Sequence, residues 1–193
     1  MVDQTPRPRG SGPWLGQVKP RMVATTSMQT LIPQLEDFRL RLTLSRPFAT
    51  HLQCLAVMAR FPNGCCKPAS LLAARYIVAS LAVPHTRVQL HANGVRGRTS
   101  HAWLRVEDNI VDITIDQFSD GPRSLVVPLS SSWHAEFTGD RPYLYADFMQ
   151  MSQHYRNDFD ALYEHALSRD TTIQPAPVAL QPLPAQPVAD TVE

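Results

Sequence analysis

The stretch "SHAWLRVEDNIVDITID", residues 100–116, places two alternating runs of apolar and polar residues on either side of Asp108 and Asn109. Alternation with a period of two predicts two antiparallel strands, and the Asp-Asn pair predicts the turn between them. A turn centred between Asp108 and Asn109 gives one face only apolar pairs. These pairs are Val106 with Val111, Leu104 with Ile113, and Ala102 with Ile115. This face is expected to contact the core.

The same register gives the opposite face of the hairpin a chemical pair. It places His101 across from Asp116, with Cβ atoms about 5 Å apart. A carboxylate at that separation can accept a hydrogen bond from the imidazole and fix its tautomer. Asp112 falls opposite Arg105, which favours an ion pair, although Asp112 lies on the face of His101. Asp116 is therefore the first choice for the acid, and Asp112 is the alternative.

Outward from this hairpin, the patterns predict an α+β domain: helices come first, then an antiparallel sheet of about four strands, then a C-terminal helix. Asn93-Gly94 predicts a further hairpin turn, since Asn-Gly is a strong signal for such turns. The other predicted elements are helices at 31–44, 46–60, 66 to about 80 and 142–168, and a strand at 124–129. The helix that starts near residue 66 is apolar on most faces, which indicates a central, buried helix.

Cys66 stands where that central helix begins, in "FPNGCCKPAS", residues 61–70. The unpaired backbone N–H groups and positive dipole at a helix N-terminus favour a thiolate. The same N–H groups can hold a developing oxyanion. A histidine brought beside this helix start would complete an activated nucleophile with its base. A buried core cysteine is the alternative interpretation of Cys66, and Cys54 is expected in the core of the second helix.

These residues resemble the papain-like and transglutaminase-like superfamily, which carries Cys on a helix, His on a strand and Asp or Asn on the next strand. The resemblance covers about residues 46–118 and rests on "GCC" at 64–66, "KPAS" at 67–70 and "HAW" at 101–103. It implies that Cys66 rather than Cys65 is the nucleophile. It also allows Asp112 as the acid, because Thr114 follows two residues later. The Gln that often precedes the Cys in papain-like proteases is missing here.

The resemblance implies a cysteine-dependent acyl-transfer enzyme that acts on peptide or protein amides: a protease, an amidase or a protein-glutamine deamidase. Cys66 would attack, His101 would carry the proton, and Asp116 or Asp112 would orient His101. Gly64, Cys65 and Trp103 are candidates for contact with substrate, and aromatic packing is the alternative for Trp103. No cofactor is expected. The competing hypothesis is a non-catalytic binding or scaffolding protein of the same fold.

Both ends of the 193-residue chain are rich in proline and poor in apolar periodicity. We expect disordered tails at 1–28 and 170–193 around a folded domain at 29–169. The second tail contains "PLPAQP", which fits docking of a partner as an extended segment.

Composition limits the other function classes. The net charge of +1, without a basic run interleaved with aromatics, argues against nucleic-acid binding. No stretch is apolar and long enough to span a bilayer, and no signal peptide is visible, so a cytoplasmic protein is expected, with secretion by another route left open. No Cys-x-x-Cys pair occurs, so no metal site is expected. His134, His154 and His165 lie in polar contexts and are expected on the surface.

Overall fold

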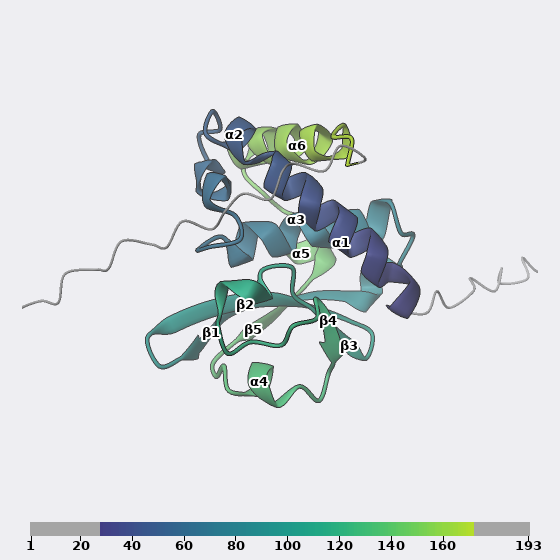
Figure 1. Cartoon of the computed structure of the whole chain (residues 1–193), viewed down its shortest axis with the longest axis vertical. Coiled ribbons are helices and arrows are strands. Elements are labelled where there is room, and N and C mark those ends of the chain that lie inside the picture. Colours follow the sequence, from purple (N-terminus) through teal and green to yellow (C-terminus); the bar gives the residue numbers. More distant parts are fainter. Residues whose placement is uncertain (1–27, 172–193) are drawn as a thin grey trace, which may run out of the picture.

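The computed structural model describes residues 28–171, in which the long helices gather on one side of a single sheet (Figure 1). The predicted tails at 1–28 and 170–193 lie outside the described residues, apart from Met28, Asp170 and Thr171. The helices are α1 (Met28–Leu44), α2 (Arg46–Ala49), α3 (Cys66–Ala79), α4 (Ser132–Ala135), α5 (Tyr145–Phe148) and α6 (Gln153–Leu167). Short 3-10 turns lie at Ala56–Arg60, His85–Arg87 and Ile115–Gln117.

The sheet is antiparallel throughout and has the strand order β4-β3-β2-β1-β5. Its strands are β1 (Val88–Arg96), β2 (Thr99–Val106), β3 (Asn109–Val111), β4 (Val126–Pro128) and β5 (Arg141–Leu144). This confirms the α+β class and the order of helices, sheet and C-terminal helix. The sheet has five strands rather than about four, because Arg141–Leu144 pairs with β1 instead of opening the last helix. Pro142 is tolerated there because β5 is an edge strand.

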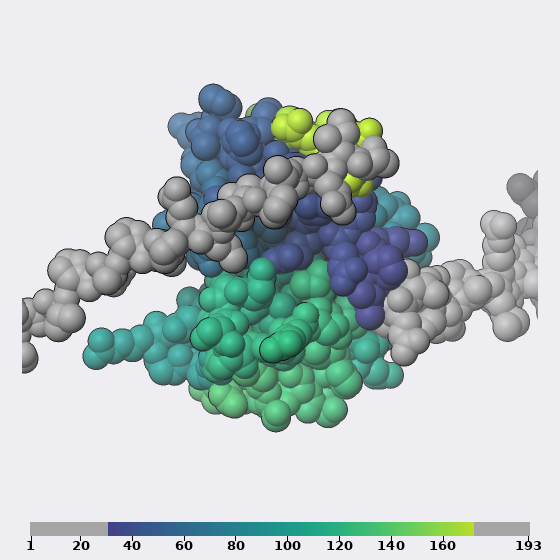
Figure 2. Space-filling model, viewed as in Figure 1, coloured from purple at the N-terminus to yellow at the C-terminus, as the bar shows by residue number. Residues whose placement is uncertain are grey.

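Two apolar clusters stabilise the sheet from its two faces. The larger one lies between the sheet and helices α1, α3 and α6, and it includes Phe38, Leu72, Leu104 and Phe159. The smaller aromatic cluster contains Trp103, Ile110, Ile115, Leu125, Trp133 and Phe137. Figure 1 shows α4 on the side of the sheet away from the large helices. Figure 2 shows the helical and the strand segments packed into one continuous surface, from which part of the strand region projects at one side.

Helix α3 begins at Cys66 and ends at Ala79, as the sequence predicts, and its middle is buried. The predicted helix at 46–60 is wrong in its centre. Helix α2 ends at Ala49, and the chain turns helical again only at Ala56–Arg60. Between them the Cys54 backbone N–H donates to the Asp158 carboxylate on α6. Because the Cys54 N–H donates to Asp158, it cannot also donate to the backbone carbonyl four residues earlier, as a continuous helix would require. Cys54 is consequently exposed rather than part of the core.

The Asn93-Gly94 hairpin turn is also wrong, because β1 continues through both residues and turns at Gly97. Asn93, at φ 64°, lies in a bulge between His91 and Gly94. A Cβ at Gly94 would lie 3.1 Å from the Cβ of Phe137 and 3.2 Å from Cη2 of Trp103. The glycine therefore serves close packing of the aromatic cluster rather than chain reversal.

The hairpin of β2 and β3 has a different register from the predicted one. Val106 pairs with Asn109 and Leu104 with Val111, so the two-residue turn is Glu107-Asp108, with Glu107 at φ 56°. This change moves every pairing by two positions, which keeps the residues of the two paired strands on their predicted faces. Ala102, Leu104, Val106, Val111 and Ile113 are buried in the larger cluster as expected, whereas Ile115 belongs to the aromatic cluster.

Candidate active site

The Cys66 side chain is partly exposed at the first residue of α3. Cys65 is the N-cap residue and provides no side-chain cap. Pro68 in the first turn has no N–H to donate. The backbone N–H groups of Cys66 and Lys67 therefore begin the helix without a side-chain acceptor, which is the arrangement that stabilises negative charge at a helix start.

His101 lies on β2 and is buried, with 1% of its surface exposed. Its Nε2 is 2.6 Å from Oδ2 of Asp112, so the Nε2–H donates to that carboxylate. The opposite ring nitrogen, Nδ1, does not contact Asp112 and lies 3.5 Å from Nε2 of Gln117. Cys66 lies near enough to the imidazole to take part in raising its pKa. The helix start and the strand thus bring a thiol, an imidazole and a carboxylate into one array.

Asp112, not Asp116, is the acid that contacts His101. Asp112 follows β3 directly and is 1% exposed. Asp116 lies in the 3-10 turn at Ile115–Gln117, is half-exposed and pairs with Arg39. The expectation that Asp116 stands opposite His101 fails because the tighter turn moves the pairing by two residues and because β3 ends at Val111. The predicted pair of Arg105 and Asp112 is absent too, since Arg105 donates to the Glu107 carbonyl.

The Asp112 carboxylate has four hydrogen-bond donors. Thr114 donates from its N–H and its hydroxyl to Oδ1, both at 3.0 Å. His101 and His134 both donate from Nε2 to Oδ2, at 2.6 and 3.3 Å. Burial alone would raise the pKa of Asp112, but the hydrogen bonds from the two histidines and from Thr114 outweigh it and lower the pKa to about 2. Asp112 therefore carries its negative charge at neutral pH.

The pKa of His101 responds to the same contacts in the opposite direction. Burial alone would lower it, because a buried imidazolium loses hydration. Hydrogen bonding with Asp112 and Cys66 outweighs burial and raises the pKa of His101 to about 9. A protonated His101 places a positive charge beside the Cys66 side chain.

Cys65 differs from its neighbour. Its side chain is 1% exposed and packs in the larger cluster. Burial and the adjacent Cys66 raise the pKa of the Cys65 thiol to about 12, so it stays protonated at neutral pH. The resemblance selects Cys66 over Cys65, and the contrasting surroundings of the two thiols favour the same assignment.

The three residues expected at the substrate occupy different environments. Gly64 is exposed in the left-handed region at φ 65°, and its N–H donates to the side chain of Gln117. Cys65 is a core residue. Trp103 is 5% exposed and packs among His91, His101 and His134, so the structure gives it an aromatic packing role.

Gln117 and His134 are site residues that sequence reasoning did not identify. Gln117 Oε1 accepts from the Gly64 N–H at 3.3 Å, and its Nε2 is 3.5 Å from Nδ1 of His101. Its NH₂ group thus points to the nitrogen that faces the thiol. His134 was expected on the surface but is only 3% exposed. Trp133 and Phe137, four residues apart around it, were the one sign that this segment has a buried side.

His101, Asp112 and His134 offer metal-ligand atoms that lie within 4.8 Å of one another, the one such group among residues 28–171. However, the two Nε2 atoms already donate to the same oxygen of Asp112. A metal ion would need lone pairs on those nitrogens instead of protons. We therefore interpret the three side chains as a hydrogen-bonded array.

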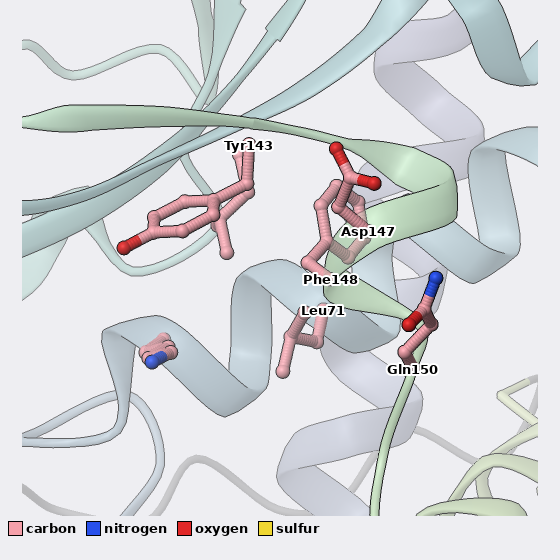
Figure 3. Close-up of a pocket in the computed structure, with 7 residues that line it drawn as sticks. Leu71, Tyr143, Asp147, Phe148 and Gln150 are labelled. Carbon is pink, nitrogen blue, oxygen red and sulfur yellow. The ribbon is translucent and has the colours of Figure 1, made fainter.

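A pocket of about 200 Å³ lies between α3, β5 and α5, and Lys67, the residue after Cys66, is one of its lining residues. In Figure 3, Leu71 of α3 lies below Tyr143 of β5, and Asp147, Phe148 and Gln150 line the other end. A second pocket, of about 390 Å³, lies between Arg39 of α1 and the segment 115–125. Both are open spaces near elements that build the site.

Within the described residues, no helix combines the length and apolar character that crossing a membrane requires. Comparison of the chain with protein-family models, with curated proteins and with solved structures finds no match.

Proposed function

We propose that this chain is a cysteine-dependent acyl-transfer enzyme related to the papain-like and transglutaminase-like superfamily, and that it hydrolyses amides of peptides or proteins. The observation that carries the proposal is the position of buried His101, hydrogen-bonded to Asp112 on one side and beside partly exposed Cys66 on the other. A nucleophile, a proton carrier and an orienting acid are the three groups that this chemistry needs.

In the proposed reaction the Cys66 sulfur attacks the amide carbonyl carbon and forms a tetrahedral oxyanion. The backbone N–H of Cys66 and the Gln117 NH₂ are the donors for that oxyanion. Protonated His101 gives its proton to the leaving amine as the C–N bond breaks, which leaves an acyl thioester on Cys66. A water molecule then loses a proton to His101 and attacks the thioester, which releases the carboxylic acid and restores the thiolate–imidazolium pair.

The first test is alkylation with iodoacetamide in a Cys54→Ser background, since Cys54 is also exposed. We expect one labelled site, Cys66, because Cys65 is buried and protonated. Cys66→Ala should abolish labelling and the release of p-nitrophenol from p-nitrophenyl acetate, whereas Cys65→Ala should retain both. Mass spectrometry locates the label. Turnover that persists in Cys66→Ala would refute the enzyme proposal and leave the binding-protein hypothesis.

The second test concerns Gln117. An oxyanion donor assists acylation but not alkylation, because iodoacetamide forms no tetrahedral oxyanion. Gln117→Ala should slow acylation of Cys66 by p-nitrophenyl acetate about 100-fold while changing the iodoacetamide rate by less than about twofold. Stopped-flow absorbance measures the first rate and mass spectrometry the second. Equal losses in both reactions would show that Gln117 only supports the loop at Gly64.

A further inference from the structure

His134 is a second imidazole that contacts the Asp112 carboxylate, on the same oxygen as His101. Its Nε2 is 3.3 Å from Oδ2 of Asp112, and its Nδ1 is 3.0 Å from the Ser131 hydroxyl. Asp112 is charged and can only accept, so the proton of His134 must lie on Nε2. Nδ1 and the Ser131 hydroxyl share the second hydrogen bond. The two contacts together fix the orientation of a buried imidazole ring.

The segment that carries His134 holds this side chain next to Asp112. Helix α4 is a single turn that begins after Ser131, between β4 and β5. Trp133 and Phe137 anchor this turn in the aromatic cluster under the sheet. The His134 ring also meets Trp103 at 5.3 Å between ring centres. A segment whose only role was to cover the aromatic cluster would not need a buried polar ring directed at a carboxylate.

We propose that His134 is a positioning residue that, with Ser131 behind it, holds the Asp112 carboxylate in place for His101. The array then runs from Ser131 through His134 and Asp112 to His101 and Cys66. Asp112 shares one oxygen between two imidazoles, which weakens its hold on the His101 proton compared with a carboxylate that serves one donor. The catalytic meaning of this role rests on the proposed function, whereas the hydrogen-bonded array does not.

Other charged groups near His101 are already paired. Those facing the aromatic cluster or the strands around it are Arg96 with Asp120 and Glu136, His91 with Asp140, and Arg39 with Asp116. Direct contacts of the His101 imidazole with titratable groups come from Asp112 and Cys66, and His134 lies 6.5 Å away between ring centres. Loss of the His134 donor should therefore act on His101 through Asp112.

The first arm of the experiment is independent of activity. Two-bond ¹H–¹⁵N correlation spectra of the full chain with ¹⁵N-labelled histidine report the tautomer of each ring. We expect a proton on Nε2 of His134 in the parent protein, and Ser131→Ala to give a mixture of tautomers. A His134 protonated on Nδ1 alone, or displacement of the Nε2 protons by one equivalent of Zn²⁺, would overturn the proposal.

The second arm compares His134→Phe with His134→Gln in the Cys54→Ser background. Phe keeps ring volume and removes the donor, whereas Gln can restore an N–H near the position of Nε2. The upper limb of the pH profile for iodoacetamide labelling should move up by about one pH unit in His134→Phe. The move should be clearly smaller in His134→Gln and absent in the exposed-site control His154→Phe.

Equal profiles for the Phe and Gln variants would show that His134 only fills space. Should His134→Phe fail to fold by circular dichroism, Ser131→Ala is measured in its place, with a smaller move in the same direction expected. Absence of any labelling of Cys66 in the parent protein would refute the proposed function, and the tautomer spectra would still decide the role of His134.

Discussion

At the residue scale, the choice between two aspartates depends on burial and on the number of hydrogen-bond donors. Asp112 is enclosed and has four donors, so its charge is specifically compensated. Asp116 is half-exposed and forms an ion pair with Arg39. Exposed ion pairs of this kind add little to the stability of the folded state. Only Asp112 can orient His101.

This difference predicts a large effect for replacing Asp112 by Asn and a small effect for the same replacement at Asp116. Asp112→Asn should slow iodoacetamide labelling of Cys66 at least about tenfold, because His101 loses the charge that keeps it protonated. Asp116→Asn should leave the labelling rate within about twofold of the parent rate. It should lower the free energy of unfolding by less than about 1 kcal/mol. Labelling rates per folded molecule, with folding checked by circular dichroism, measure both effects. A slower Asp116→Asn with an unchanged Asp112→Asn would reinstate Asp116 as the acid.

At the element scale, the aromatic cluster connects β2, β3 and the α4 segment and packs against β1. Phe118, Trp133 and Phe137 each pack against the His101 ring, at 4.8 to 6.0 Å between ring centres. Arg96 of β1 covers the same rings and forms ion pairs with Asp120 and Glu136. The position of the histidine thus depends on close packing at the bulge in β1.

Gly94 is the position at which this packing can be tested. Gly94→Ala should lower the free energy of unfolding by about 1–3 kcal/mol, because its Cβ would crowd Phe137, Trp103 and Asp140 at 3.1 to 3.3 Å. Gly97→Asn is the matched control, since no atom lies within 4 Å of a Cβ there and Asn tolerates its φ of 62°. Urea unfolding measures both. Equal losses of unfolding free energy in the two variants would mean that the aromatic cluster shifts to accommodate the methyl group added at position 94.

At the scale of the whole molecule, the raised pKa of His101 links folding to pH. A histidine whose pKa is about 9 in the folded state and 6.5 in the unfolded state contributes its full stabilisation below pH 6.5. That contribution falls as pH rises through this window and is lost above the folded pKa. Asp112 acts at the other end, where its contribution is lost as pH falls from 3.8 to about 2.

The linkage between folding and pH is measured best in Cys66→Ala. This variant has no thiol at position 66, and Asp112 remains the partner of His101. Its free energy of unfolding should fall by about 1–2 kcal/mol between pH 6.5 and the pKa of His101. Urea titrations at several pH values give the slope. In the double variant Cys66→Ala/His101→Asn the slope over this window should be close to zero. A similar slope in both variants would assign the effect to another group.

The local pattern of the sequence determined the α+β order, the central helix from Cys66 and the two faces of the β2–β3 hairpin, because these follow from periodicity and helix-start chemistry. Tertiary structure decided the rest. A turn at Glu107-Asp108 placed Asp112 rather than Asp116 beside His101, and pairing with β1 made residues 141–144 a fifth strand. Gln117 and His134 joined the site through contacts with Gly64, His101 and Asp112 that local sequence does not specify, since turn register, edge pairing and burial depend on which distant segments pack together.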